Sequence, residues 1–334
     1  MSRILASIQV VNSIKTHPNG DMINISSVLG WDIVTKIGET NIGDKVVYCE
    51  IDSLIPVEAD WIPEAIKLKI QKDNISNFFR IKTLKIRGVY SQGLIIPMEN
   101  FKNKSFEELE IGSDLTESLG IKKYDNDISD GVTSNGGKFP TDLIPKTDEK
   151  RIQNHPNYLN NENIEYYSTV KLDGTSATYL YNNGEFYICS RNYRLPDSKS
   201  VWYDMAKKYQ LKEKYESNKI DPKYAFQGEI CGPSIQKNLL GLKNIDFFVF
   251  NVYDIQTGRR LWIDEMIELC NICGLKHVPV EEKGYFNFSS IEELLNKSKG
   301  KYQNTKNNRE GLVFRLKNGI SFKVINNEYL IKYE

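Results

Sequence analysis

Glu165-Tyr166-Tyr167-Ser168-Thr169-Val170-Lys171-Leu172-Asp173-Gly174-Thr175 is the stretch that decides the fold of this chain. Its β-branched and aromatic beginning predicts a strand, and the Asp-Gly pair is a turn signal that ends it. Residues 177–181 and 186–190, joined by a turn at 182–185, predict a hairpin. We therefore expect Lys171 where a strand ends and Arg191 at the far end of the next hairpin.

Four further short motifs follow this stretch in order along the chain. They are Ser190-Arg191-Asn192, Phe226-Gln227-Gly228-Glu229-Ile230, Glu310-Gly311-Leu312-Val313-Phe314 and Ser321-Phe322-Lys323-Val324-Ile325. A single Lys-x-Asp-Gly pattern occurs by chance, and a lone charged residue or strand aromatic is more often surface or core. Five motifs in one order indicate a site for nucleotidyl transfer.

Covalent nucleotidyl transfer needs a lysine amine that attacks an α-phosphate. A free lysine has a pKa near 10.4, so we expect partial burial, Arg191, Lys323 or a metal to lower the pKa of Lys171. The same cations would balance charge on the phosphates. Three carboxylates are predicted to hold a hydrated Mg²⁺ or Mn²⁺. They are Asp173, Glu229 and Glu310.

The motif set resembles that of ATP-dependent RNA ligases in the covalent nucleotidyltransferase superfamily. Residues 226–238 resemble the run found at this motif in phage-type double-strand RNA ligases, and Ile325 stands where those often have a second lysine. The resemblance implies a set of site residues. Lys171, Arg191 and Lys323 would be catalytic; Arg151, Val170, Lys171, Arg191, Glu229, Phe250, Glu310 and Lys323 would bind ATP, with Arg151 on the β- or γ-phosphate and Phe250 stacked on adenine.

The resemblance also implies an α+β architecture with two domains. Short strands at 5–11, 23–28, 32–36 and 45–51 predict a small Greek-key barrel, so we expect an OB-fold domain at 1–118. A polar linker at 119–148, richest in Asp, Asn, Ser and Gly at 125–137, leads to an antiparallel-sheet nucleotidyltransferase (adenylation) domain of the ATP-grasp-like ligase type at 149–334. The arrangement resembles the RNA-ligase branch with the OB domain in front, since we expect no room for an OB domain in the eleven residues after Lys323.

Composition sets outer limits on the interpretation. The 334 residues are 40% hydrophobic, with 44 basic and 44 acidic side chains, so charge alone argues mildly against nucleic acid. Local basic clusters are still candidate phosphate contacts: Lys82, Lys85 and Arg87, and Lys207, Lys208, Lys212 and Lys214. The pair Cys270 and Cys273 lies in a predicted helix at 264–274 that ends at a glycine cap, which favours free thiols over zinc.

The expected activity is RNA sealing through a lysyl-AMP intermediate, with ATP and Mg²⁺ or Mn²⁺ as cofactors. AMP would pass to an RNA or DNA 5′-phosphate, and an RNA 3′-hydroxyl end would then displace it in nick or break repair. We expect a monomer that binds RNA and no membrane, intracellular (cytoplasmic or nuclear) or viral-encoded and not secreted. A DNA ligase, an mRNA guanylyltransferase or a catalytically inactive nucleic-acid-binding adaptor stays open as an alternative.

Overall fold

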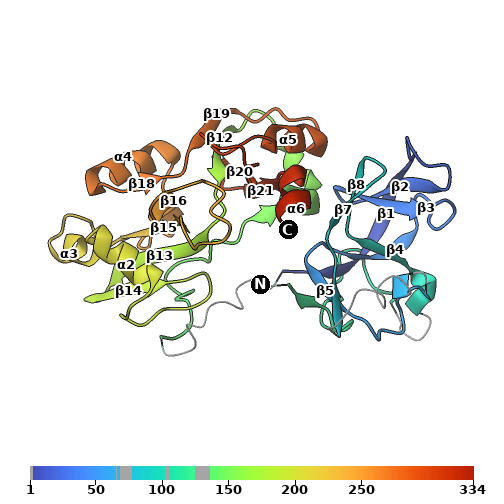
Figure 1. The fold of residues 1–334 in the computed structure, drawn as a ribbon, viewed down its shortest axis with the longest axis horizontal. Coiled ribbons are helices and arrows are strands. Elements are labelled where there is room, and N and C mark those ends of the chain that lie inside the picture. Colours follow the sequence, from blue (N-terminus) through green and yellow to red (C-terminus); the bar gives the residue numbers. More distant parts are fainter. Residues whose placement is uncertain (1–2, 65, 68–76, 102–105, 125–135) are drawn as a thin grey trace. The chain divides into compact units, whose positions relative to one another are not determined.

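The computed structural model describes residues 3–64, 66–67, 77–101, 106–124 and 136–334 (Figure 1). The chain forms two compact units. The first unit comprises Met1–Ser129, Ile152–Tyr158 and Leu330–Glu334, and the second comprises Asp130–Arg151 and Leu159–Tyr329. Residues 125–135 of the predicted linker at 119–148 lie outside the described residues.

The first unit is built from short, mainly antiparallel strands, as the sequence predicts. Its largest sheet has the order β3-β2-β1-β4-β9, and smaller sheets have the orders β10-β5-β6 and β7-β8. Its elements are β1 (Ala6–Thr16), β2 (Ile23–Val28), β3 (Trp31–Lys36), β4 (Lys45–Cys49), β5 (Ser53–Pro56), β6 (Phe78–Arg80), β7 (Thr83–Ile86), β8 (Val89–Gln92), β9 (Leu94–Pro97), η1 (Met98–Phe101) and β10 (Lys122–Lys123). The four predicted strands are confirmed, and β1 runs five residues further than expected.

A seven-residue segment from later in the chain completes the first unit. Within Ile152–Tyr158, the Asn154 side chain accepts a hydrogen bond from the Trp31 indole at 2.5 Å and donates one to Glu50 at 2.6 Å. The Gly30 amide also donates to the Gln153 carbonyl at 2.8 Å. Trp31 is fully buried, so its indole N–H needs such a partner.

The second unit contains two larger sheets and most of the helices (Figure 1). One sheet has the order β11-β21-β20-β12-β19; the other has the order β14-β13-β15-β16-β17, with β18 also paired to β16. Its elements are β11 (Lys150–Arg151), β12 (Glu165–Lys171), β13 (Thr175–Asn182), β14 (Glu185–Cys189), α2 (Val201–Lys208), α3 (Leu211–Glu216), β15 (Tyr224–Cys231), β16 (Asp246–Asp254), β17 (Arg259–Arg260), α4 (Ile263–Cys273), β18 (Lys276–His277), β19 (Val280–Tyr285), α5 (Ile291–Ser298), β20 (Gly311–Leu316) and β21 (Ser321–Ile325). The 3₁₀ turn η3 (Ile152–Asn154) belongs to the first unit, and η4 (Pro156–Asn160) and α6 (Asn327–Tyr333) have residues in both units. The predicted strand and hairpin around Lys171 are confirmed as β12, β13 and β14.

One face of the β12 sheet is an aromatic core. Tyr166 of β12 stacks on Phe314 of β20 with ring centroids 5.7 Å apart, and Phe314 stacks on Phe322 of β21 at 5.3 Å. Phe286 packs edge-on against Tyr166 and Phe322. Side chains alternate between the two faces along a strand. The residues directly before and after these rings in β12, β20 and β21 therefore lie on the opposite face of the sheet.

The second sheet is covered by helices α2, α3 and α4, which contact β14, β13 and β16 respectively. Its core includes Tyr179, Phe226 and Phe247. The predicted amphipathic helix is confirmed as α4, which ends at Gly274 in the left-handed region with φ +67°. All five cysteines are free and buried, and no helix among the described residues has the length and apolar character needed to span a bilayer.

Candidate functional site

Lys171 is the last residue of β12, and its ammonium contacts the carboxylate of Glu310. The Nζ atom lies 2.8 Å from one carboxylate oxygen and 2.9 Å from the other. Strand pairing explains this meeting of residues far apart in the sequence, because Lys171 pairs with Gly311, the first residue of β20. Figure 1 shows where β12 and β20 lie in the fold. Glu310 therefore stands directly ahead of the strand next to the lysine.

The register of the β12 sheet places the predicted phosphate-binding residues on the face opposite the aromatic core. Lys323 pairs with Val313 of β20 on one side and with Arg151 of β11 on the other. Val313 in turn pairs with Thr169, two residues before Lys171 and on the same face. Arg151 and Lys323 therefore lie on the same face of the sheet as Lys171. They belong to the cross-strand row of Thr169, which is the neighbouring row on that face.

Asp173 and Glu229 complete an acidic group around Lys171. Burial raises the pKa of Glu229 to about 8, and the charges of Glu310 and Asp173 add to that rise while Lys171 opposes it. Burial and then Glu310 raise the pKa of Asp173 to about 6, against Lys171 and a hydrogen bond from the Tyr329 side chain. Each carboxylate is hard to ionise chiefly because it is buried, and its negative neighbours add to that effect.

Lys171 itself differs from the expectation. Burial lowers its pKa, but Glu310, Glu229 and Asp173 outweigh burial, and the net result is a pKa above the ordinary value. The prediction that this pocket lowers the pKa of Lys171 is wrong for the protein without ligands. The physical reason is that three carboxylates, rather than cations, are the nearest charges.

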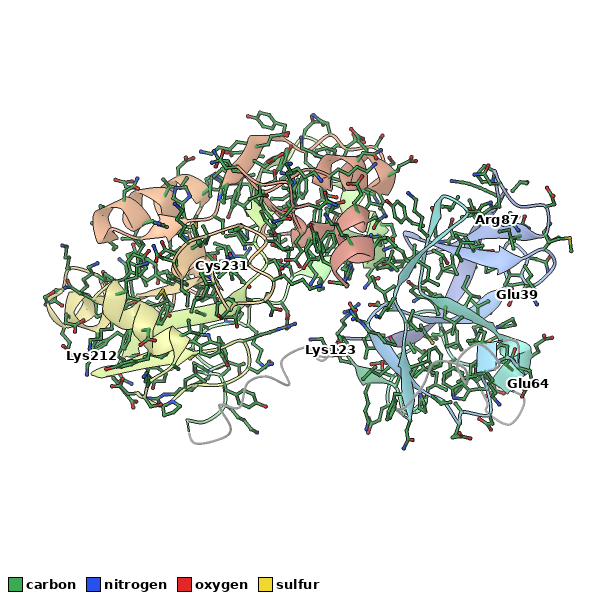
Figure 2. All side chains as sticks on the ribbon, viewed as in Figure 1. Glu39, Glu64, Arg87, Lys123, Lys212 and Cys231 are labelled. Atoms are coloured by element: carbon green, nitrogen blue, oxygen red, sulfur yellow. The ribbon has the colours of Figure 1, made fainter. Side chains whose placement is uncertain are left out.

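The turn after Lys171 requires glycine. A Cβ atom on Gly174 would lie 2.3 Å from the Ile230 carbonyl oxygen and 2.7 Å from the sulfur of Cys231. Cys231 lies in the interior of the second unit, at the end of β15 (Figure 2). The missing side chain lets the Asp-Gly turn approach β15 closely, so that Asp173 comes near Glu229.

Arg191 follows β14 in the second sheet and also belongs to this neighbourhood. Its charge opposes the raised pKa of Glu229. Its guanidinium pairs with Asp148 at 2.5 Å, and both side chains are partly exposed. The sequence therefore placed Arg191 correctly beside the hairpin, and the structure adds an acidic partner that a phosphate would have to displace or share.

Phe250 occupies a β-bulge in β16. Gln227 of β15 pairs with Asn251 and Gly228 pairs with Val249, which leaves Phe250 as the extra residue. Bulges redirect a side chain and occur next to active sites. Arg315 of β20 donates to the Phe250 carbonyl at 3.1 Å, and so ties the bulge to the first sheet.

Arg315 was not singled out from the sequence, although it follows the Glu310 motif directly. It is buried and pairs with Glu149 at 3.2 Å, and Glu149 also accepts a hydrogen bond from Ser321 at 2.7 Å. By register, Arg315 lies on the same face as Lys171. Tyr302, whose hydroxyl contacts the main chain of both Lys171 and Glu310, was missed as well and lies in no motif.

Other predicted contacts fare differently. The side chain of Val170 lies on the aromatic face, and its amide donates to the Pro279 carbonyl at 2.9 Å, so its contact with a nucleotide stays a prediction.

Two of the clustered lysines have structural partners: Lys208 pairs with Asp246 at 2.9 Å, and Lys214 donates to the Cys273 carbonyl at 2.8 Å. Lys212 on α3 is exposed (Figure 2).

The carboxylates suit a hydrated divalent cation. Within the described ranges, no three acidic, histidine or cysteine side chains are arranged to ligate one ion directly. Burial, and then the negative charge of neighbouring carboxylates, raise the pKa of Asp173 and Glu229, and a nearby cation would lower both pKa values. Oxygen ligands reached through water are typical of Mg²⁺ sites.

Two protein-family models match parts of this chain. An RNA ligase family model matches residues 164–333, and an OB-fold domain model matches residues 5–98. A search of curated proteins gave no significant match.

Solved structures of the Naegleria gruberi RNA ligase resemble the chain over nearly its full length. A mutant with ATP and Mn is 34% identical, with a TM-score of 0.88, 99% of this chain covered and 98% of that one. The enzyme with PPi is 35% identical, with a TM-score of 0.88 and 99% of each chain covered. A further mutant with AMP and Mn is 34% identical, with a TM-score of 0.89 and 99% of each chain covered. The chain therefore belongs to the RNA ligase family, with an OB-fold domain at its N-terminus.

Proposed function

We propose that the protein is an ATP-dependent RNA ligase that works through a lysyl-AMP intermediate in nick or break repair. The observation that carries the proposal is the contact of Lys171 with Glu310 on a sheet face that also bears Arg151 and Lys323. Relatives solved with ATP, with AMP and with PPi support the proposal that this chain binds ATP and releases pyrophosphate.

In the first step the deprotonated amine of Lys171 attacks the α-phosphorus of ATP. The bond to the β-phosphate oxygen breaks, and pyrophosphate leaves with that electron pair. Glu310, in contact with the ammonium, is the nearest acceptor for the proton that the amine gives up. In the second step a 5′-phosphate oxygen takes AMP from Lys171; in the third, an RNA 3′-hydroxyl attacks the activated phosphate and AMP leaves.

The other residues bind and orient the reactants. Arg151, Arg191 and Lys323 hold phosphate oxygens in line with Lys171, as their placement around it supports. Phe250 stacks on adenine, and Val170, next to Lys171 on β12, contacts the nucleotide through its main chain. Arg315 fixes the main chain at Phe250 by its hydrogen bond to the carbonyl.

Asp173, Glu229 and Glu310 would hold the Mg²⁺ or Mn²⁺ through water. When bound, such an ion supplies positive charge that stabilises the phosphate oxygens and the ionised carboxylates. The proposal also keeps the domain limits expected from the sequence: an OB-fold domain at 1–118, a linker at 119–148 and an adenylation domain at 149–334. The protein would act on RNA as a monomer.

The test is transfer of label from [α-³²P]ATP to the protein, followed by sealing of nicks. We expect a covalent adduct with ATP that is labile in acid and stable in alkali, as a phosphoramidate is, and that Lys171→Ala abolishes, while Lys219→Ala, an exposed lysine after α3, retains it. A label from GTP and none from ATP would indicate a guanylyltransferase, and no label from either would indicate an inactive adaptor. Equal sealing of all-DNA nicks and of nicks with a ribose 3′-hydroxyl would reject the RNA assignment.

A further inference from the structure

The hydroxyl group of Tyr302 bridges the main chain of the two residues that form the central ion pair. It donates to the Lys171 carbonyl oxygen at 3.0 Å and accepts from the Glu310 amide at 3.1 Å. The side chain is only 4% exposed. One phenol therefore holds both the predicted nucleophile and the carboxylate that contacts it.

The bridge lies where the strand ladder between β12 and β20 stops. The last paired residues are Lys171 and Gly311, so the Glu310 amide falls one position beyond the ladder. The Tyr302 hydroxyl adds a side-chain link between β12 and the residue before β20, one position beyond the last paired residues. The effect is to fix the main chain at the point from which the Lys171 and Glu310 side chains project toward each other.

The loop that carries Tyr302 is itself held firmly by hydrogen bonds. The Tyr302 amide donates to the Asn307 carbonyl at 3.0 Å, and the Thr305 amide and hydroxyl donate to the Tyr302 carbonyl at 3.1 and 3.0 Å. The Thr305 hydroxyl also accepts from the Asn307 amide at 3.1 Å. These bonds hold the main chain from which the phenol projects.

Arg309 closes the other end of this loop. Its guanidinium pairs with Glu281 at 2.6 Å and 3.0 Å and donates to the carbonyls of Lys297, Ser298 and Lys299. The side chain is buried, so this set of partners satisfies a charge that would otherwise be costly. Arg309 immediately precedes Glu310, and the anchoring therefore reaches the site directly.

We propose that Tyr302 is a positioning residue for lysine adenylylation, which sets the geometry of Lys171 against Glu310 through its two hydrogen bonds. The inference rests on the proposed function, because it assigns Tyr302 to the step in which Lys171 attacks ATP. Reactions between held groups depend steeply on alignment, and displacements of about 1 Å can reduce rates about 100-fold. Tyr302 does not need to contact ATP to have this effect.

The test compares Tyr302→Phe with Tyr215→Phe. Tyr215 is a matched control because its hydroxyl is also buried in the second unit and donates to a main-chain carbonyl, that of Tyr224, at 2.6 Å. The full-length proteins are incubated with [α-³²P]ATP at temperatures well below unfolding, and the maximal rate of adduct formation and the KM for ATP are measured. We expect Tyr302→Phe to reduce the maximal rate about 10- to 100-fold with KM within about twofold, and Tyr215→Phe to leave both within about twofold.

The result that would overturn the inference is a Tyr302→Phe rate equal to the wild-type rate or to that of Tyr215→Phe. If Tyr302→Phe does not fold, Thr305→Val decides, since it removes a hydroxyl that holds the loop and keeps the phenol. We expect a two- to fivefold lower maximal rate with KM unchanged; an unchanged rate would contradict the inference. Failure of the wild-type protein to form any adduct would instead refute the proposed function, so the two failures are distinct.

Discussion

Glu310 stands 2.8 Å from Lys171 in the protein without ligands. The lysine is kept protonated by this carboxylate and its two acidic neighbours, although burial alone would favour the neutral amine. The charges of the protein around Lys171 therefore favour its protonated form. In the proposed reaction, a divalent cation that accompanies ATP would offset this negative charge before Lys171 attacks.

Replacing Glu310 by glutamine should reduce adenylylation strongly. The change removes the proton acceptor and one predicted metal carboxylate and keeps the size of the side chain. We expect adduct formation to fall at least about 100-fold, in the range seen when a group that orients or stabilises a reacting centre is lost. Glu292→Gln removes one exposed carboxylate from α5 and should leave the rate unchanged. Equal rates in the two variants would contradict the assignment of Glu310.

Replacing Phe250 by alanine should weaken ATP binding more than it slows chemistry. Stacking of a base on an aromatic ring contributes about 1–3 kcal/mol, so KM for ATP should rise roughly 5- to 150-fold with a small change in maximal rate. Phe248→Ala is the control, because Phe248 is half-buried on the same strand but lies outside the bulge. A similar KM in both variants would remove Phe250 from the adenine site.

Asp246 should make stability depend on acid pH. Hydrogen bonds from Lys276, Tyr209 and Lys208 overcome burial and lower its pKa to about 2. A folded-state pKa below the unfolded value stabilises the protein above pH ~4, and this stabilisation is lost as pH falls toward 2. We expect Asp246→Asn to lower Tm at pH 7 by about 2–4 °C, equivalent to about 1 kcal/mol after solvent screening of the lysines.

The difference in Tm between wild type and Asp246→Asn should shrink as the pH is taken below 4. Asp264→Asn is the matched control, because Asp264 forms an exposed ion pair with Lys283. It should change Tm by less than about 1 °C at any pH, as exposed pairs contribute little. A constant Tm difference for Asp246→Asn from pH 7 to pH 3 would show that its charge is not the cause.

Gly311→Ala should destabilise the second unit. Gly311 has φ +155°, and a Cβ atom there would lie 2.1 Å from the Val324 carbonyl oxygen. Such a clash with main chain costs about 1–3 kcal/mol and should lower Tm by roughly 2–12 °C. Gly319→Ala shares a positive φ, +92°, but its Cβ would meet nothing within 4 Å. We expect Gly319→Ala to lower Tm less than Gly311→Ala, because it adds backbone strain without the clash. Equal decreases in Tm for the two variants would exclude the clash at Gly311 as the cause.

Much of the fold could be predicted from local patterns. The β-branched run before Lys171, the hairpin after it and the glycine cap at Gly274 are each determined by residues close in sequence, and all are confirmed. The meeting of Lys171 with Glu310 was expected only from motif order. The strand register explains it, since it places Gly311 opposite the lysine.

The missed features depend on contacts that no local pattern encodes. Tyr302 lies in an irregular loop, and only the folded chain brings its hydroxyl to the main chain of residues 131 and 8 positions away. The predicted lowering of the pKa of Lys171 was also wrong, because the pKa is raised. The sequence shows which charged residues exist but does not show which of them lie nearest to the lysine. Lys208, expected among phosphate contacts, instead pairs with Asp246, 38 positions later.

The insertion of Ile152–Tyr158 into the first unit has a practical consequence for anyone dividing this protein. A fragment that starts at residue 136 would carry Asn154 away from Trp31 and Glu50. A barrel expressed alone would in turn leave a buried indole N–H without its acceptor. Each half would then display polar atoms that the intact polypeptide covers, so co-expression of both fragments, rather than either alone, is the sensible route to stable pieces.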